Sequence, residues 1–476
     1  MRDTRGSCSS TSDCSNCCRL QRRIRSLEGT VARLRFLLDE AIRAGKRQAT
    51  PFSKGKVKRN PKKPGRKAGK RYGARASRPR PSVIDEVIDV PLPSEECPCC
   101  GGELGEEEIH EQFFTDIPPI RPRTTQFNVH CAHCLDCGER IQGHHPLQTS
   151  DALGAASCQI GPNAISFAAH LNKCLGTSYG RIANLFSMIF CFTVARSTLA
   201  RAINRLGEKA EPLYSEITVI VRQSQVVYPD ETGWKIGGTK AWLWDFVSLL
   251  QRATLYTIRP SRGGEVAAEV LGADFAGTLG HDGWSPYDSF CEASHQQCVA
   301  HLLRRCRELL EVATRGAVRF PRQLKELLQD AILLRDRRDR KEVSPHGLAV
   351  ARGRLERRLD RLLAWTRSDE ANERLAKHID EHRGQIFTFL RNPDVEATNW
   401  PAEQAIRPAV VNRKLSGGNR TERGARVQSV LMSIFRTCWQ RRHNPIELLV
   451  NLQRTSDPRE FAATALGPPS RPKPDG

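Results

Sequence analysis

Three carboxylates in the chain have local settings that suit metal-dependent chemistry on phosphodiesters. Asp230 follows the apolar, β-prone run 226–228, and Asp282 ends a second expected strand at 274–281. Two aspartates at the ends of neighbouring strands can share hard divalent cations, which prefer carboxylate oxygens. Glu403 would lie in the first turn of a helix that begins at the proline of TNWPAEQAIRP. A third carboxylate allows two Mg²⁺ (or Mn²⁺) ions to be held about 4 Å apart, where they stabilise the attacking and leaving oxygens.

Simpler roles exist for the same residue types, and spacing alone does not decide between them. An aspartate after a strand often forms a turn, and Glu403 could serve only as a favourable charge near a helix N-terminus. Basic residues behind Glu403 surround the loop LSGGN, which we expect to cradle a phosphate, because guanidinium groups bind phosphate through paired hydrogen bonds. These basic residues are Arg407, Arg413, Lys414, Arg420 and Arg423.

Two cysteine-rich segments, CPCCGGEL at 97–104 and CAHCLDCGERI at 131–141, have the spacing of zinc knuckles. In each, a Cys-x-x-Cys pair is followed by a glycine that permits the tight turn. Four thiolates leave no open position for water, so the Zn²⁺ that they would bind is structural. Cys99 and Cys131 are competing ligands, since Cys131 also forms a Cys-x-x-Cys pair with Cys134. The predicted ligands are Cys97, Cys100, Cys134 and Cys137.

Residues 178–206 are expected to form two helices joined by a short apolar turn. Apolar residues at helical spacing would bury one face of each helix, and Thr193 or Ser197 would cap the second helix. Basic and polar residues would cover the outer face of that helix, as on a helix that enters the major groove of DNA. Any helical hairpin could show this pattern, so plain packing is the alternative. The outward residues are Arg196, Ser197, Thr198, Arg201 and Arg205.

The overall charge favours a polyanionic partner. The 476-residue chain has a formal net charge of +21, which indicates nucleic acid first and an anionic membrane surface second. The sequence contains no uninterrupted run of about 18 apolar residues, so no membrane-spanning helix is expected. The first residues lack the apolar core of a signal peptide. We therefore expect a cytoplasmic protein with no membrane partner. Its 17 cysteines are unevenly spread, and clustered cysteines in an unsecreted chain favour metal binding over disulfides.

Composition divides the chain into segments of different kinds. Residues 18–45 repeat apolar residues at heptad positions, which predicts a helix that either packs on its own domain or pairs two protomers as a coiled coil. Residues 46–82 carry about fifteen Lys and Arg among Pro and Gly, which predicts a disordered linker that contacts phosphates. The other expected segments are 1–17 (disordered, with Cys8, Cys14, Cys17 and Cys18 as a further candidate metal site), 83–148 (zinc module), 149–222 (helical, helix-turn-helix-like and DNA-binding), 223–452 (catalytic, with a helical insertion at about 298–391) and 453–476 (tail).

Several long segments, in this order, resemble the DDE transposases of the insertion sequence 66 type found in bacteria. The segments are DETGWKIGG followed by WLWDFVS, RPSRGGEVAAEVLG, GTLGHDGWSPYDSF, CVAHLLRRC and NWPAEQAIRPAVVNRKLSGGNRTERGARVQSVLMSIFRTC. The resemblance covers residues 20–450 or so. It implies an α/β, ribonuclease H-like catalytic core, in which helices flank a mixed sheet and a helical insertion precedes the catalytic glutamate. It places the family's carboxylates on Asp230, Asp282 and Glu403. It also places a Cys-x-Ala-His motif on Cys298 and His301, where packing and ligation are equally open.

The resemblance further implies a function. The protein would bind the terminal inverted repeats of its element in double-stranded DNA, cut the ends and join the freed 3′ hydroxyls to target DNA. A homo-oligomer would hold two ends together, proteins encoded beside the element could assist, and the protein would associate with the bacterial nucleoid. Three alternatives remain: a catalytically inactive DNA-binding relative, a zinc-dependent hydrolase and an RNA-cleaving ribonuclease H relative. The hydrolase would need an open zinc site, which a four-cysteine set does not offer.

Overall fold

A computed structural model describes residues 15–45, 79–118, 120–154, 157–313, 315–365, 367 and 369–468. The chain divides into two compact units, Met1–Asp116 and Ile117–Gly476, and each is described by itself. Most of the expected basic linker, most of the expected N-terminal segment (with Cys8 and Cys14) and the end of the tail lie outside the described residues.

The first unit contains one long helix and an irregular segment that carries the first cysteine knuckle. Helix α1 (Ser15–Gly45) begins before the heptad pattern does. Its heptad leucines Leu20, Leu27 and Leu34 are 58%, 57% and 60% exposed, so the apolar seam lies on the surface. Residues 79–116 have little regular structure apart from an isolated antiparallel bridge at the knuckle.

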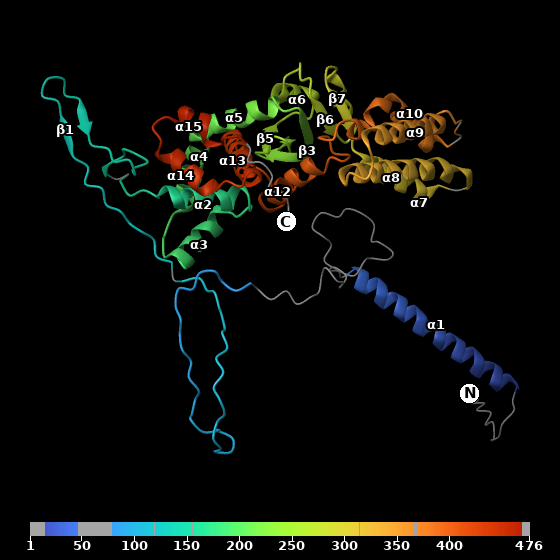
Figure 1. Cartoon of the computed structure of the whole chain (residues 1–476), viewed down its shortest axis with the longest axis horizontal. Coiled ribbons are helices and arrows are strands. Elements are labelled where there is room, and N and C mark those ends of the chain that lie inside the picture. Colours follow the sequence, from blue (N-terminus) through green and yellow to red (C-terminus); the bar gives the residue numbers. More distant parts are fainter. Residues whose placement is uncertain are drawn as a thin grey trace, which may run out of the picture. The chain divides into compact units, whose positions relative to one another are not determined.

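A five-stranded mixed sheet is the centre of the second unit (Figure 1). Its strands lie in the order β5-β4-β3-β6-β7; the first three are antiparallel, and β3, β6 and β7 are parallel. Their bounds are β3 (Val226–Ile236), β4 (Thr239–Ser248), β5 (Ala253–Arg259), β6 (Thr278–His281) and β7 (Ser294–Gln297). A separate two-stranded ladder at the second cysteine knuckle is formed by β1 (Cys131–His133) and β2 (Arg140–Gln142).

Two details of the strands differ from the expectation. The first strand does not end before Asp230 but continues to Ile236, because residues on both sides of the Gly237–Gly238 turn keep pairing. Both glycines have positive φ (56° and 87°), as a two-residue hairpin turn that follows strand twist requires. The second expected strand is shorter than 274–281, since β6 begins at Thr278.

Alternate residues of the strands point to opposite faces of the sheet, and each face has its own core. Val227, Trp244 and Phe246 pack into one core, whereas Val226 and Tyr228 belong to the other. The helices of the first core are α2 (Pro162–Lys173), α3 (Tyr179–Phe190), α4 (Arg196–Lys209), α5 (Glu211–Arg222), α6 (Gly264–Leu271), α13 (Glu422–Arg441), α14 (Pro445–Arg454) and α15 (Pro458–Ala465).

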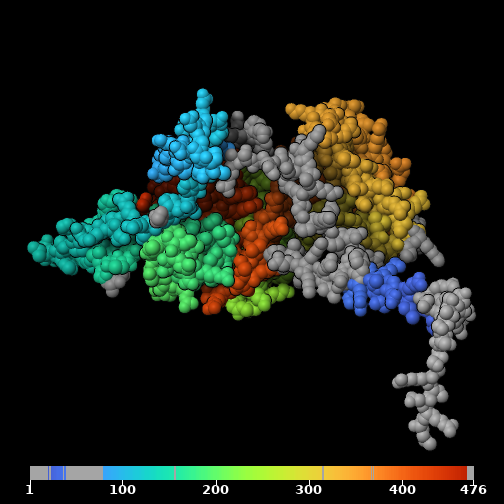
Figure 2. All heavy atoms as spheres, turned by 90° about the horizontal axis from the view of Figure 1, so that it is seen from below, coloured from blue at the N-terminus to red at the C-terminus, as the bar shows by residue number. Residues whose placement is uncertain are grey.

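The second core is built from the helices that follow β7. Helices α7, α8, α9 and α10 gather beside the sheet as a lobe of their own, seen in gold and orange in Figures 1 and 2. The helices of this core are α7 (Val299–Val312), α8 (Arg319–Asp339), α9 (Pro345–Leu363), α10 (Glu370–Glu381), α11 (Thr388–Arg391) and α12 (Trp400–Ser416). The prediction of a mixed sheet flanked by helices is thus confirmed.

Helix α13 covers the free edge of the sheet. Strand β5 is the outermost strand on that side, and its outward N–H groups at Thr254 and Tyr256 donate to the hydroxyls of Thr437 and Ser433 at 3.1 and 2.8 Å. Side-chain hydroxyls of a helix thereby take the place of a further strand. Among the described helices, none is long and apolar enough to cross a membrane.

Candidate active site

The sheet brings Asp230 and Asp282 level with each other. Strand β3 pairs with β6 only at Val226 and Val227, the latter opposite Leu279. Asp230 lies three residues beyond Val227, and Asp282 lies three beyond Leu279. Because the two strands are parallel, both aspartates lie where β6 ends and β3 continues only in the hairpin with β4. This fork in the sheet holds the two carboxylates side by side.

Helix α12 is tied to the same fork and carries Glu403 in its first turn. Asn399 occupies the N-cap, and its Nδ2 donates to the carbonyl of Pro229 at 3.0 Å. Farther along, the hydroxyl of Tyr256 donates to the carbonyl of Ala405 at 2.6 Å. The N–H of Glu403 closes the first turn on Asn399 at 3.1 Å. The helix that bears the third carboxylate is therefore fixed to the residue that precedes Asp230.

The three carboxylates interact electrostatically, although their oxygens do not all lie within 4.8 Å of one another. The pKa of Asp230 is raised to about 7, first by burial, then by the neighbouring Glu231, and also by Asp282 and Glu403. Asp282 and Glu403 are exposed, so burial of Asp230 itself is the main cause and repulsion adds to it. A divalent cation would relieve the repulsion, and oxygen-rich, mutually repelling carboxylates are the donor set that Mg²⁺ and Mn²⁺ prefer. The residues present thus fit the metal that the sequence implies.

Glu231 is adjacent to Asp230 but is engaged on the other face of the sheet. Its carboxylate forms an ion pair with Arg262 at 2.7 Å. The Arg262 guanidinium in turn lies over the rings of Trp242 and Trp284, at 4.8 and 4.5 Å from their centroids. Of the two adjacent acids, Asp230 is the one turned toward the helix of Glu403.

A fourth carboxyl group, which the sequence reasoning missed, lies behind Asp230. Asp245 is the cross-strand partner of Asp230 in the β3–β4 ladder. It is fully buried, and neither of its oxygens has a hydrogen-bond partner among the described residues. Burial, with repulsion from Asp230, raises its pKa well above the usual value. The signal in the sequence was a single acid in an otherwise apolar strand, at a position that alternation assigns to the same face.

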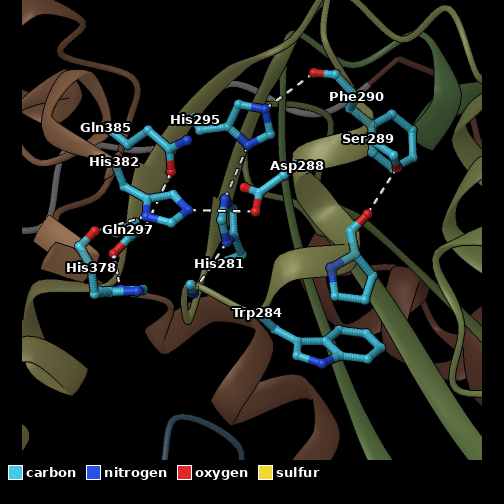
Figure 3. Close-up of polar contacts among 12 residues, drawn as sticks. His281, Trp284, Asp288, Ser289, Phe290, His295, Gln297, His378, His382 and Gln385 are labelled. Atoms are coloured by element: carbon cyan, nitrogen blue, oxygen red, sulfur yellow. Dashed lines mark hydrogen bonds and ion pairs between the residues drawn. The ribbon is translucent and has the colours of Figure 1, made fainter. Parts of the chain in front are cut away.

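A chain of histidines fixes the loop that carries Asp282 (Figure 3). The N–H of Gly283 donates to Nδ1 of His281 at 3.1 Å, so Nε2 of His281 bears the proton and donates to Nδ1 of His295 at 3.0 Å. Nε2 of His295 then donates to the carbonyl of Phe290 at 3.1 Å. Burial, with a smaller effect of nearby histidines, lowers the pKa of His281 to about 3. His281 is thus neutral, in the tautomer set by its partners.

The loop LSGGN makes hydrogen bonds inside the protein. The N–H groups of Gly417, Gly418 and Asn419 all donate within the protein, that of Asn419 to the carbonyl of Lys235 at 2.9 Å. Trp234 Nε1 donates to the Asn419 side chain at 2.8 Å. The loop therefore fastens α12 to the end of the β3–β4 hairpin. Since these amides already have acceptors, a phosphate would have to be bound by the surrounding basic side chains, and this binding stays a prediction.

The basic residues around this loop fall into two groups. Arg413 donates to the hydroxyl of Thr232 at 3.1 Å and to the carbonyl of Gly233, and Arg423 forms an ion pair with Glu208. Both arginines therefore contact other residues of the protein. Arg423 is nevertheless exposed, as are the remaining three, so that a polyanion could reach all four: Arg407, Lys414, Arg420 and Arg423.

The helical pair α3 and α4 presents its basic residues to solvent. The N-cap of α4 is Ala195, with no side-chain cap bond, so the expectation of Thr193 or Ser197 as the cap is wrong. Leu199 and Ile203 are buried in the core. The outward residues have the exposure expected of them, Thr198 being half-buried and the others exposed: Arg196, Ser197, Thr198, Arg201 and Arg205.

Both cysteine knuckles are formed, one in each unit. The N–H of Gly101 donates to the carbonyl of Cys97 at 2.8 Å, and that of Gly138 donates to Cys134 at 3.0 Å. Both glycines have positive φ, 72° and 74°, which explains why glycine follows each Cys-x-x-Cys pair. Backbone N–H groups inside each turn lower the pKa of the Cys97 and Cys134 thiols. A thiol that ionises readily is a better zinc ligand.

The identical turns favour one ligand pairing over its competitor. Cys134 opens the second knuckle as Cys97 opens the first, whereas Cys131 lies on strand β1, paired with Gln142. Cys137 is therefore the natural second ligand there, as Cys100 is in the first knuckle. The sharing of one Zn²⁺ by the two knuckles stays a prediction.

Comparison with known proteins agrees with this architecture. Residues 157–427 match the family described as "Transposase IS66 family", and the chain belongs to that family. The resemblance noted from the sequence is confirmed. The chain is also similar to two uncharacterized proteins of Sinorhizobium fredii (strain NBRC 101917 / NGR234). It is 25% identical to y4qI over 54% of this chain and 52% of that protein, and 23% identical to y4hP over 76% and 70%. The match to y4qI thus spans about half of that relative's length.

Proposed function

We propose that this chain is a DNA transposase that cuts the terminal inverted repeats of its element and transfers the freed ends to target DNA, with Asp230, Asp282 and Glu403 as its catalytic carboxylates. The observation that carries the proposal is the level register of the two aspartates on neighbouring parallel strands. The tie between Asn399 and Pro229 supports the same site, because it holds the helix of Glu403 beside Asp230.

Each reaction step balances without a protein nucleophile. In cleavage, the oxygen of water forms a bond to phosphorus, the bond from phosphorus to the 3′ oxygen breaks, and that oxygen leaves as a 3′ hydroxyl. In transfer, this hydroxyl attacks a phosphorus of the target, whose own 3′ oxygen leaves. Divalent cations held by the three carboxylates would supply the charge stabilisation for the attacking and leaving oxygens.

The protein residues set up this site. Asp230, Asp282 and Glu403 bind and orient the cations, and Asp230 must give up its proton to do so, because its pKa is about 7 without a cation. Asn399 and the histidine pair, His281 with His295, are positioning residues. They hold the helix of Glu403 and the loop of Asp282 in place.

DNA affinity would come from regions outside the carboxylate site. The exposed arginines of α4, the exposed basic residues around the LSGGN loop and the basic linker would contact phosphates, and a structural zinc at the cysteine knuckles would shape part of this surface. The exposed heptad seam of α1 supports pairing of two protomers, so that two DNA ends are held together.

The test is Mg²⁺-dependent nicking of labelled duplex DNA that carries the element's own ends. Asp230→Asn and Glu403→Gln are expected to lower the cleavage rate at least a thousandfold with DNA binding intact. Glu422→Gln is the matched control, because Glu422 is also a first-turn glutamate, at the start of the next helix, and is exposed. Cleavage that survives either of the first two substitutions would contradict the site.

A further inference from the structure

A second group of metal-binding side chains lies beside the carboxylates. The thiol of Cys298, a ring nitrogen of His301 and a carboxylate oxygen of Glu403 all lie within 4.8 Å of one another. Among the described residues, this is the group of three metal-binding side chains that lie so close together. The proposed phosphodiester chemistry makes no use of the first two.

The fold builds this group where two helices begin. Cys298 is the N-cap of α7, and its own N–H donates to the carbonyl of His281 at 2.7 Å. The N–H of Asn399, the N-cap of α12, donates to the Cys298 sulfur at 3.2 Å, and the N–H of Val299 donates to the carbonyl of Ala397 at 2.9 Å. The first turns of α7 and α12 are thus held against each other, with the sulfur between them.

The hydrogen bonding and exposure of Cys298, His301 and Glu403 are compatible with a bound ligand. His301 Nδ1 is buried without a hydrogen-bond partner among the described residues, and a buried polar atom of this kind costs stability unless something binds it. The Cys298 sulfur accepts the N–H of Asn399 at the start of α12 and lies at the start of α7 without a cap bond of its own. Burial raises the pKa of this thiol, so a bound cation rather than the fold would favour the thiolate. Glu403 is exposed, which leaves a path from solvent to the group.

Sulfur, nitrogen and oxygen together select a softer ion than the one that three carboxylates select. Zinc sites with an open position use three such protein ligands, at about 2.0–2.3 Å from the metal. Tetrahedral ligands at those lengths lie about 3.3–3.8 Å apart. The distances between the three ligand atoms would therefore shorten by up to about 1 Å when an ion binds.

We propose that Cys298, His301 and Glu403 form a site for Zn²⁺ or a similar thiophilic divalent cation, with a fourth position open to solvent. Glu403 would then be shared between this site and the Mg²⁺ site. A thiophilic ion would draw the carboxylate away from the magnesium pair and so inhibit cleavage. Only this inhibitory consequence rests on the proposed function; the binding of the ion does not.

The experiment measures Co²⁺ binding to the full chain, stripped of metal and kept reduced. Wild type is expected to bind one Co²⁺ per chain more than Cys298→Ser, His301→Gln or Glu403→Gln, with a stronger thiolate-to-cobalt absorption than Cys298→Ser. Any Co²⁺ at the zinc knuckles is common to all of these proteins and cancels. Cys306→Ala is the matched control, because Cys306 is also a buried cysteine of α7, and it should keep the wild-type stoichiometry.

The outcomes separate the two proposals. His301→Gln and Glu403→Gln are the two variants least expected to disturb folding, and circular dichroism checks their fold. If they bind as much Co²⁺ as wild type, the proposed site is wrong. Where cleavage is measurable, micromolar Zn²⁺ should inhibit wild type at fixed Mg²⁺ and should inhibit His301→Gln at least tenfold less. Equal inhibition of the two would overturn the shared role of Glu403. Absence of cleavage in wild type would contradict the proposed function and leave the cobalt result to decide on the metal site.

Discussion

Asp245 lies directly across the β3–β4 ladder from Asp230, fully buried and with no hydrogen-bond partner for either oxygen among the described residues. Cross-strand partners project to the same face of a sheet. Two carboxyl groups therefore share one poorly solvated space, and Asp230 disfavours ionisation of Asp245. Since the pKa of Asp245 lies well above its usual value, Asp245 is the member of the pair that keeps its proton while Asp230 gives one up.

This relationship leads to the first prediction. Asparagine is a close mimic of a protonated aspartate, so Asp245→Asn should retain cleavage within about threefold at pH 7 and should fold normally. Asp245→Ala removes buried atoms and should lower the free energy of unfolding by about 1–3 kcal/mol. Denaturant unfolding and nicking assays measure the two effects. Loss of cleavage in a folded Asp245→Asn protein would instead show that the Asp245 carboxylate itself binds a cation.

Asp230 should make the metal-free protein less stable as the pH rises. Its pKa is raised from 3.8 to about 7 in the folded protein, so its contribution to stability is fully present below the unfolded value and is lost as the pH rises through 7. The total loss is up to about 4 kcal/mol, at about 1.4 kcal/mol for each unit of pKa.

Asp230→Asn should therefore be more stable than wild type at pH 8 without Mg²⁺ and about equally stable at pH 4. Saturating Mg²⁺ should stabilise wild type more than the variant, because the cation binds the ionised carboxylate. Thermal unfolding at the two pH values, with and without Mg²⁺, measures this. An unchanged stability difference across pH would show that Asp230 is not a strained carboxylate.

Much of the sheet could be predicted from the sequence, because its signals are local. Alternating apolar residues on either side of Gly237–Gly238 predict the hairpin, and the apolar run before Asp230 predicts its first strand. The length of that strand could not be predicted in the same way. Residues beyond Asp230 are extended because β4 pairs with them along their whole length, and local composition does not show such pairing.

The candidate site was predictable only in part, for a related reason. The three carboxylates were indicated by spacing and by family resemblance, and their catalytic role stays a prediction. Asp245 was missed because its significance depends on its cross-strand partner. The tie between the LSGGN loop and the hairpin was missed because the amide of Asn419 bonds to Lys235, far away in the sequence. Contacts between distant segments decide both cases.

The histidine pair should matter through the N–H of Gly283. His281→Leu leaves this N–H without its acceptor, which should lower the free energy of unfolding by about 1–3 kcal/mol and loosen the loop of Asp282. His281→Asn keeps an acceptor near the position of Nδ1 and should lose less of both stability and cleavage. Unfolding and nicking assays on the two variants decide this, and equal losses would show that the hydrogen bond does not position Asp282.

Burial of neutral His281 also makes the stability of the folded protein depend on pH. Its pKa falls from 6.5 to about 3 on folding, so the stability that it contributes is present above pH 6.5 and is lost as the pH falls toward 3. His281→Asn should therefore unfold less steeply between pH 6.5 and 4 than wild type. Parallel acid-unfolding curves for the two proteins would contradict the buried neutral histidine.

Two adjacent glycines of the LSGGN loop distinguish strain from close packing. Both have positive φ, 77° at Gly417 and 113° at Gly418. A Cβ on Gly417 would meet no atom within 4 Å, whereas one on Gly418 would collide with the carbonyl of Lys235. Gly417→Ala should cost about 1 kcal/mol of stability from backbone strain alone, and Gly418→Ala more than about 2 kcal/mol. Denaturant unfolding measures both, and equal costs would show that the loop does not fasten α12 to the hairpin.

Arg201 on α4 should contribute to DNA binding through phosphate contact. It is exposed on the same face as Arg205, so Arg201→Ala should weaken binding to specific and unrelated duplexes alike and reduce the log–log salt slope by about one. Arg459→Ala is the control, since Arg459 is an exposed arginine on α15, away from α4 in the chain. Binding measured across a salt series gives the slopes. A loss confined to the terminal repeats, with an unchanged slope, would instead mean that Arg201 reads bases, because base contacts specify sequence whereas phosphate contacts release counterions.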